Sequence, residues 1–170
     1  MITIREAVVA DAAAIARIHT DSWQHAYRGI LHDAFLARIS VSERTVKWTG
    51  FLENPRPKTS TFVALNEGFI VGFCRVGASR IEGAAATASE LYAIYLDPNH
   101  TGKGVGSKLH DAGLDRLRSA GFKSATLWAL AENETARSFY ERKGWKTDGA
   151  VCTDQIDEAT FNDMLYSIDL

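Results

Sequence analysis

The chain has 170 residues, of which 46% are hydrophobic and 24% charged, and its formal net charge is −2. This composition is typical of one folded domain over residues 1–170, and the charge argues against a nucleic-acid or membrane-surface partner. No segment approaches the roughly 20 apolar residues of a membrane span, and no apolar leader segment follows Arg5 and Glu6. We therefore expect a cytoplasmic protein in which Cys74 and Cys152 are buried, reduced thiols.

The first half of the chain predicts a strand, three helices and a hairpin. Alternation predicts a strand over residues 2–5, and helical spacing follows from Ala12 to Trp23. Two further helices are expected over residues 32–39 and 42–52. The apolar segments 61–65 and 69–76 are joined by Asn66-Glu67-Gly68, which predicts a hairpin with a three-residue loop.

The second half predicts four strands and two helices. The strands are expected over residues 90–96, 122–130, 145–152 and 164–170. One helix covers residues 105–120, and another begins after Asn133 and ends at Gly144. The order β-α-α-α-β-β-β-α-β-α-β-β predicts an α/β protein with a mixed, mostly antiparallel sheet of six to seven strands and helices on its faces.

A glycine-rich loop joins the strand ending at Leu96 to the following helix. It reads Thr101-Gly102-Lys103-Gly104-Val105-Gly106-Ser107. Glycines allow positive φ and close approach of a ligand to the backbone. Successive N–H groups at a helix N-terminus bind anions, so a diphosphate is a suitable ligand. The alternative is a tight strand-helix turn that binds nothing.

Two other phosphate-binding motifs fit this loop poorly. A Walker loop requires Gly-Lys-Ser/Thr in that order, whereas Ser107-Lys108 follows Gly106. A dinucleotide fingerprint requires G-x-G-x-x-G and an acidic residue about 20 positions later. The spacing of Gly102, Gly104 and Gly106 differs, and residues 122–126 contain no acid.

The loop and two neighbouring segments together resemble the GCN5-related N-acetyltransferase (GNAT) family. The loop resembles its Gln/Arg-x-x-Gly-x-Gly/Ala signature, with Thr101 in the first position. Residues 90–98 resemble the family's fourth strand and turn. Residues 133–145 resemble its Asn-x-x-Ala-x-x-Phe-Tyr-x-x-x-Gly-Phe segment. The resemblance covers nearly the whole chain and implies a sheet that splays apart between its fourth and fifth strands.

The family resemblance implies direct transfer of acetyl from acetyl-CoA to a primary amine. A non-catalytic acyl-CoA-binding regulatory module on the same fold is the alternative. The pantetheine arm is expected to pair with backbone groups of Ile94 and Leu96. A backbone N–H of the same segment, with Tyr95 as the candidate, is expected to polarise the thioester carbonyl. The pyrophosphate is expected on residues 102–107, with Asn133 near the pantetheine. Lys103 either contacts the cofactor or is a solvated loop lysine.

Two residues are the predicted catalytic groups. Tyr140 can donate a proton to the CoA sulfur, or it is a core tyrosine. Glu90, at the start of the fourth strand, can accept the proton of the amine, or it is an exposed carboxylate at a strand end.

The acceptor pocket is expected around the first helix and the break that follows it. Trp23, Tyr27 and Arg28 are the predicted acceptor-binding residues, whereas His19 fits better at the edge of the core. The acceptor is a small-molecule amine or a peptide N-terminus. Members of the family often form homodimers, and no metal site is expected.

Overall fold

The computed structural model describes residues 1–156 and 159–170. In this part of the chain the elements follow the predicted order of strands and helices. The strands are β1 (Ile2–Glu6), β2 (Ser60–Asn66), β3 (Phe69–Ala78), β4 (Ala88–Leu96), β5 (Ser124–Leu130), β6 (Val151–Ile156) and β7 (Ala159–Asp169). The helices are α1 (Ala12–Ala26), α2 (Asp33–Arg38), α3 (Val41–Glu53), α4 (Val105–Ser119) and α5 (Glu134–Arg142).

The strands form one mixed sheet in the order β1-β2-β3-β4-β5-β7-β6. Every neighbouring pair is antiparallel except β4 and β5, which are parallel. This confirms the predicted mixed, mostly antiparallel sheet. The helical crossover from β4 through α4 to β5 is what makes that parallel pair possible.

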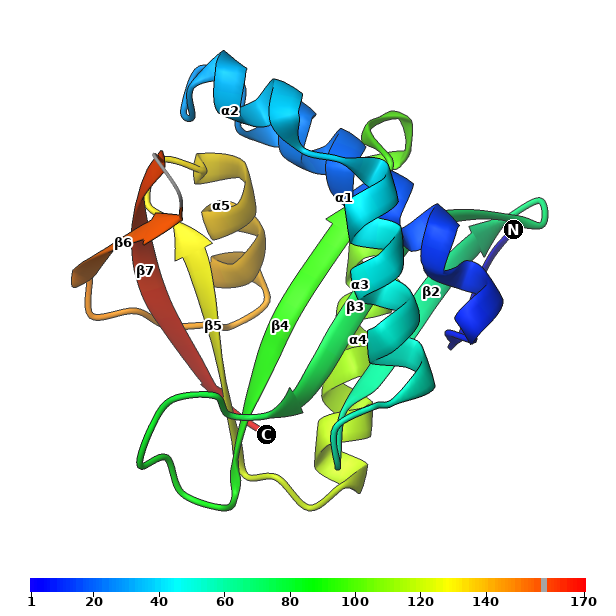
Figure 1. Cartoon of the computed structure of the whole chain (residues 1–170). Helices are drawn as coiled ribbons and strands as arrows, with labels where there is room; N and C mark the ends of the chain where they lie inside the picture. Colours follow the sequence, from blue (N-terminus) through cyan, green and yellow to red (C-terminus); the bar gives the residue numbers. More distant parts are fainter. Residues whose placement is uncertain (157–158) are drawn as a thin grey trace.

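The sheet splits between β4 and β5, as predicted. Pairing joins residues 88–90 of β4 to residues 124–126 of β5 and stops there. Beyond Glu90 the two strands diverge, which gives the open V of Figure 1. A β-bulge contributes, because Val76 and Arg75 of β3 oppose Leu91 and Ala93, leaving Tyr92 as the extra residue of β4. Bulges bend a strand and increase its twist.

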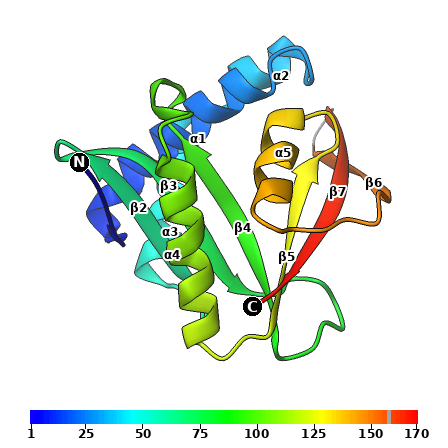
Figure 2. The ribbon, with the colours of Figure 1, turned by 180° about the vertical axis from the view of Figure 1, so that it is seen from behind.

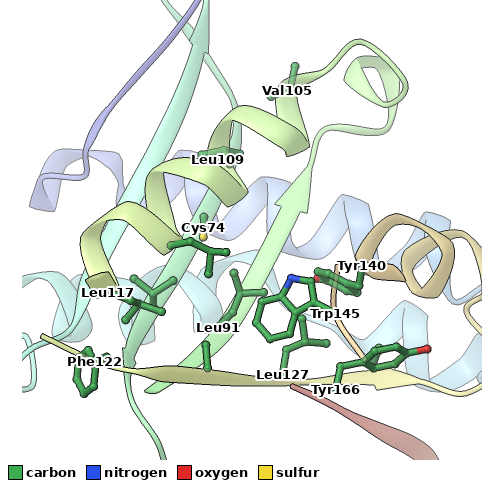
Figure 3. Close-up of a cluster of buried hydrophobic side chains, with 14 of the residues drawn as sticks. Cys74, Leu91, Val105, Leu109, Leu117, Phe122, Leu127, Tyr140, Trp145 and Tyr166 are labelled. Atoms are coloured by element: carbon green, nitrogen blue, oxygen red, sulfur yellow. The ribbon is translucent and has the colours of Figure 1, made fainter. Parts of the chain in front are cut away.

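Helices cover both faces of the sheet. Helices α1 and α3 lie on one face over a core around Ile15, Trp48 and Phe73. Helix α4 lies on the other face, where Figure 2 shows it in front of the strands. The larger core lies under α4 and continues to α5, as Figure 3 shows. A third cluster joins the end of α1 and α2 to Phe161 of β7.

Three local predictions were wrong. Asn66 pairs with Phe69, so the hairpin loop has two residues, Glu67 and Gly68, both with positive φ. Two-residue loops with positive φ at both positions are favoured in hairpins, because their backbone twist matches the right-handed twist of the two strands. The predicted strand over residues 145–152 begins only at Val151. Lys146 makes no more than an isolated bridge to Ser167, and the Thr147 and Asp148 side chains then accept from the N–H groups of Gly149 and Ala150, which forms a turn in place of a strand. Cys74 is buried as expected, whereas Cys152 is exposed.

Candidate functional site

The open edge of β4 is the first element of the site. Asp97 N–H donates to Val71 O of β3 (2.9 Å). Because successive N–H groups of a strand point to opposite sides, the N–H of Tyr95 also faces β3. The N–H groups of Ile94 and Leu96 face the split, where β5 has left the sheet. Strand geometry therefore favours Ile94 and Leu96 as backbone partners of a ligand and disfavours the Tyr95 N–H.

The glycine loop lies directly beyond this edge, at the N-terminus of α4. Gly102 and Gly104 have φ values of 71° and 78°, and Gly104 is the N-cap without a side-chain cap. The first helical hydrogen bond joins Lys108 N–H to Gly104 O (3.2 Å), so the N–H groups of residues 105–107 have no partner within the helix. Together these N–H groups form a concave anion site.

Two side chains of the loop stabilise its backbone. Thr101 Oγ1 donates to Pro98 O (3.0 Å), and Lys103 Nζ donates to Asn99 O (2.9 Å). Thr101 thus supports the turn through its hydroxyl. Gly106 packs near Leu96, where an added Cβ would come within 3.5 Å of Cδ1. Residues 101–104 of the loop are exposed, and the chain becomes buried again at Val105.

Helix α5 brings Tyr140 to the split from the other side. Asn133 caps this helix by accepting from Ala136 N–H (3.1 Å). Tyr140 is 7% exposed and packs against Trp145 and Phe139 (Figure 3). In the described part of the chain, its hydroxyl makes no side-chain hydrogen bond. Burial, reinforced by Tyr95 and Cys74, raises the pKa of Tyr140 and keeps the phenol protonated.

The predicted acceptor residues separate into an aromatic cluster and one exposed side chain. Trp23 contacts Tyr27 edge to face, with ring centres 4.9 Å apart. His19 stacks on Tyr95 at the same distance. Arg28 is exposed at the break after α1 and lies outside the aromatic cluster. The structure therefore brings Trp23 and Tyr27 together. The Tyr95 ring also belongs to this cluster, whereas the sequence analysis gave Tyr95 a role only through its backbone N–H.

His19 acts as a structural member of this cluster. Its Nδ1 accepts from Trp48 Nε1 (3.2 Å), which fixes the neutral ring with its proton on Nε2. Burial and the charge of Arg44 lower the pKa of His19 to about 3. It is neutral at physiological pH.

Arg44 of α3 is a site residue that the sequence analysis missed. Its guanidinium carbon lies 4.9 Å from the centre of the Trp23 ring. The signal was available, because Arg44 precedes the buried Trp48 by four residues and so shares its inward face.

Glu90 lies at the inner end of the split, where β4 and β5 still pair. It is 1% exposed, which excludes the alternative of an exposed strand-end carboxylate. Both of its oxygens are engaged by Arg80: the Arg80 backbone N–H donates to Oε2 (3.0 Å), Nε donates to Oε1 (3.1 Å), and Nη2 forms an ion pair with Oε1. This pairing counts against direct proton transfer to Glu90, whose role as the base stays a prediction.

Other kinds of site are not indicated in the described residues. No group of three or more His, Cys, Asp and Glu side chains among residues 1–156 and 159–170 is arranged to hold a metal ion. Within the same residues, no helix combines the length and apolar character needed to cross a bilayer. The Cys74 thiol is buried, and burial raises its pKa to about 12, so it is inert as a nucleophile.

Comparison with known proteins agrees with this geometry. A family model described as "Acetyltransferase (GNAT) family" matches residues 13–145. The uncharacterized N-acetyltransferase YuaI of Bacillus subtilis is 34% identical over 134 residues, which cover 78% of this chain and 74% of YuaI.

Two solved structures share the fold. The PaiA N-acetyltransferase of Thermoplasma acidophilum, in complex with coenzyme A, superposes with a TM-score of 0.76 at 19% identity, over 100% of this chain and 99% of that one. The putative acetyltransferase YncA of Salmonella typhimurium, with acetyl-CoA, superposes with a TM-score of 0.75 at 22% identity, over 100% and 94%.

Proposed function

Because the chain belongs to the GNAT acetyltransferase family, we propose that it transfers acetyl from acetyl-CoA directly to the primary amine of a small molecule or a peptide N-terminus. The observation that carries this proposal is the open edge of β4 leading into the glycine loop, with Tyr140 facing it from α5. When bound, acetyl-CoA supplies an activated acetyl thioester. The residues of this chain must hold it, orient the amine and manage two protons.

The cofactor would be held mainly by the backbone. The N–H groups of Ile94 and Leu96 face the split and suit the amides of a pantetheine arm. The partnerless N–H groups of residues 105–107 and the positive-φ glycines of the loop suit a pyrophosphate. Lys103 is engaged with Asn99 O, so its contribution is a nearby positive charge. Asn133 is committed to capping α5, which places the helix that carries Tyr140.

Tyr140 is the proposed acid. Its phenol is protonated because burial raises its pKa, and its hydroxyl is not committed to another side chain of the described residues. An N–H of Ile94 or Leu96 would stabilise negative charge on the carbonyl oxygen of the acetyl group. Since neither Tyr95 N–H nor Cys74 is suitably placed, the proposal uses neither.

Glu90 and the aromatic cluster take the remaining roles. We infer that Glu90 holds the inner end of the split together through Arg80, and so positions β4, rather than taking the proton of the amine directly. The ammonium group would lose its proton to water before attack. As the C–N bond forms and the C–S bond breaks, Tyr140 would protonate the sulfur and then take up the proton that the nitrogen releases. Trp23, Tyr27 and the Tyr95 ring form the wall against which the acceptor would bind. A regulatory module without activity would have no use for an uncommitted tyrosine hydroxyl at the split, so the enzyme is favoured.

The test is calorimetry with acetyl-CoA followed by an assay of CoA release over a panel of amines. We expect binding, and CoA release only when an acceptor amine is present. Binding without turnover of any amine would support the regulatory alternative, and absence of binding at millimolar acetyl-CoA would reject the proposal.

A further inference from the structure

Arg44 is a half-buried cation without an anionic partner in the described part of the chain. Its Nη1 is buried and makes no hydrogen bond. The guanidinium lies over the Trp23 ring, and burial lowers the pKa of Arg44 although arginine stays charged. Leaving a buried, charged donor unsatisfied is unfavourable. Such an arrangement is typical of a site that is completed by a ligand.

A second donor without a partner lies beside it. Trp23 Nε1 is also buried and makes no hydrogen bond of normal length, and the one polar side chain that bears on it is the nearby Tyr95 hydroxyl, which a ligand oxygen could replace as the acceptor. Buried polar groups are nearly always satisfied in folded proteins, so two adjacent exceptions are informative. Both belong to residues that share the aromatic cluster, because Tyr95 and Tyr27 lie close enough to influence the pKa of Arg44. Tyr95 in turn lies close enough to Tyr140 to add to the rise in the pKa of Tyr140 that burial causes. The two donors therefore lie on the acceptor side of the split.

We propose that Arg44 and Trp23 Nε1 bind a carboxylate of the acceptor, so that the acceptor is an amino acid or a similar small molecule with both an amine and a carboxylate. This inference rests on the proposed acetyltransferase function. A guanidinium matches a carboxylate with two parallel hydrogen bonds, and the Trp23 ring lies against the guanidinium of Arg44.

An acidic side chain near the same aromatic cluster would complement the positive charge of the acceptor's ammonium group. Burial raises the pKa of both Tyr27 and Tyr95, and the charge of Asp163 on β7 adds a smaller effect in the same direction, so an acidic side chain lies near the tyrosines on the side of β7. An acceptor placed along Trp23 and Tyr27 would have its carboxylate toward Arg44 and its ammonium group toward Asp163. The arrangement of charges thus matches a zwitterion.

The test compares acceptors that differ only in the carboxylate. The twenty L-amino acids are assayed with acetyl-CoA beside their α-carboxamides, for example L-leucine, L-leucinamide and 3-methylbutylamine. For the best amino acid, kcat/KM is expected to exceed that of its amide by about tenfold or more. Arg44→Met should lower kcat/KM for the amino acid by about 10- to 100-fold, mostly through KM, and leave the amide within about twofold. Lys47→Met, at an exposed position of the same helix, is the matched control and should change neither.

The outcomes separate this inference from the function on which it rests. Equal use of amino acids and amides by the unaltered enzyme overturns the inference, as does an equal loss on both in Arg44→Met. Acetyl-CoA binding without acetylation of any carboxylate-bearing amine also overturns it. The comparison of acceptors on the unaltered enzyme is valid even where Arg44→Met fails to fold. Absence of acetyl-CoA binding rejects the acetyltransferase function itself.

Discussion

At the scale of single residues, Tyr140 and Tyr166 form a matched pair of tyrosines. Their ring centres are 6.5 Å apart, but Tyr166 accepts from Arg137 and donates to Glu141, whereas Tyr140 has no such partner among the described residues. Tyr140→Phe should lower kcat by about 10²- to 10⁴-fold, because a positioned acid contributes that much, with little change in acetyl-CoA affinity. Steady-state kinetics and calorimetry measure the two quantities.

Tyr166→Phe is the control for that prediction. It removes a hydroxyl from a second tyrosine whose side chain is buried in the same core, so it should cost about 1 kcal/mol of unfolding free energy and leave kcat within about twofold. A wild-type kcat in Tyr140→Phe would remove the acid role from Tyr140.

His19 gives a prediction about pH and stability. In the unfolded chain its imidazole titrates near 6.5, whereas burial and Arg44 lower the folded pKa to about 3. Between these values the unfolded state binds the extra proton. The free energy of unfolding should therefore fall as the pH is lowered from about 6.5, by up to about 1.4 kcal/mol per pH unit from this residue.

Denaturant titrations from pH 7 to pH 4 measure that slope. His19→Gln should reduce it, and His25→Gln, at an exposed position of the same helix, should not. An imidazole resonance of His19 that titrates near pH 6.5 in the folded protein would contradict the account.

At the scale of elements, the inner end of β4 depends on the Glu90–Arg80 pair. Removing either partner should lower the unfolding free energy by about 1–3 kcal/mol, and the Glu90→Gln/Arg80→Gln double variant should lose less than the sum of the single losses, because the two groups interact. If Glu90 is structural, Glu90→Gln retains the acid limb of the pH–rate profile. A flattened acid limb in Glu90→Gln alone would instead assign the base to Glu90.

The two ends of α4 offer another matched comparison. Gly104 at the N-cap has a φ of 78°, and Gly121 after the C-terminus has a φ of 86°. Alanine at either position should cost about 1–2 kcal/mol of stability, because an L side chain is strained there. Only Gly104→Ala should also weaken acetyl-CoA binding, by about tenfold, because only this glycine lies in the proposed anion site. Equal affinities of the two variants would exclude the loop as the pyrophosphate site.

At the scale of the whole molecule, local signals allowed the sequence to predict the element order and the glycine loop. Strand alternation, helical spacing and turn residues such as Gly104 and Asn133 act within a few positions. The split itself followed from the family resemblance. The contacts that were missed join distant segments: α3 brings Arg44 onto Trp23, and the loop after β3 returns Arg80 to Glu90. The spacing of hydrophobic residues does not indicate which partner a charged side chain contacts in a distant segment.

The most direct test of the central claim is a coupled measurement on the purified chain: release of free CoA thiol from acetyl-CoA, with mass spectrometry of the acceptor, over a panel of amines and amino acids. The account predicts that thiol release requires an amine and that the product carries acetyl on its nitrogen. It also predicts that Tyr140→Phe lowers this rate while acetyl-CoA still binds. Absence of both acetyl-CoA binding and amine-dependent thiol release would contradict it.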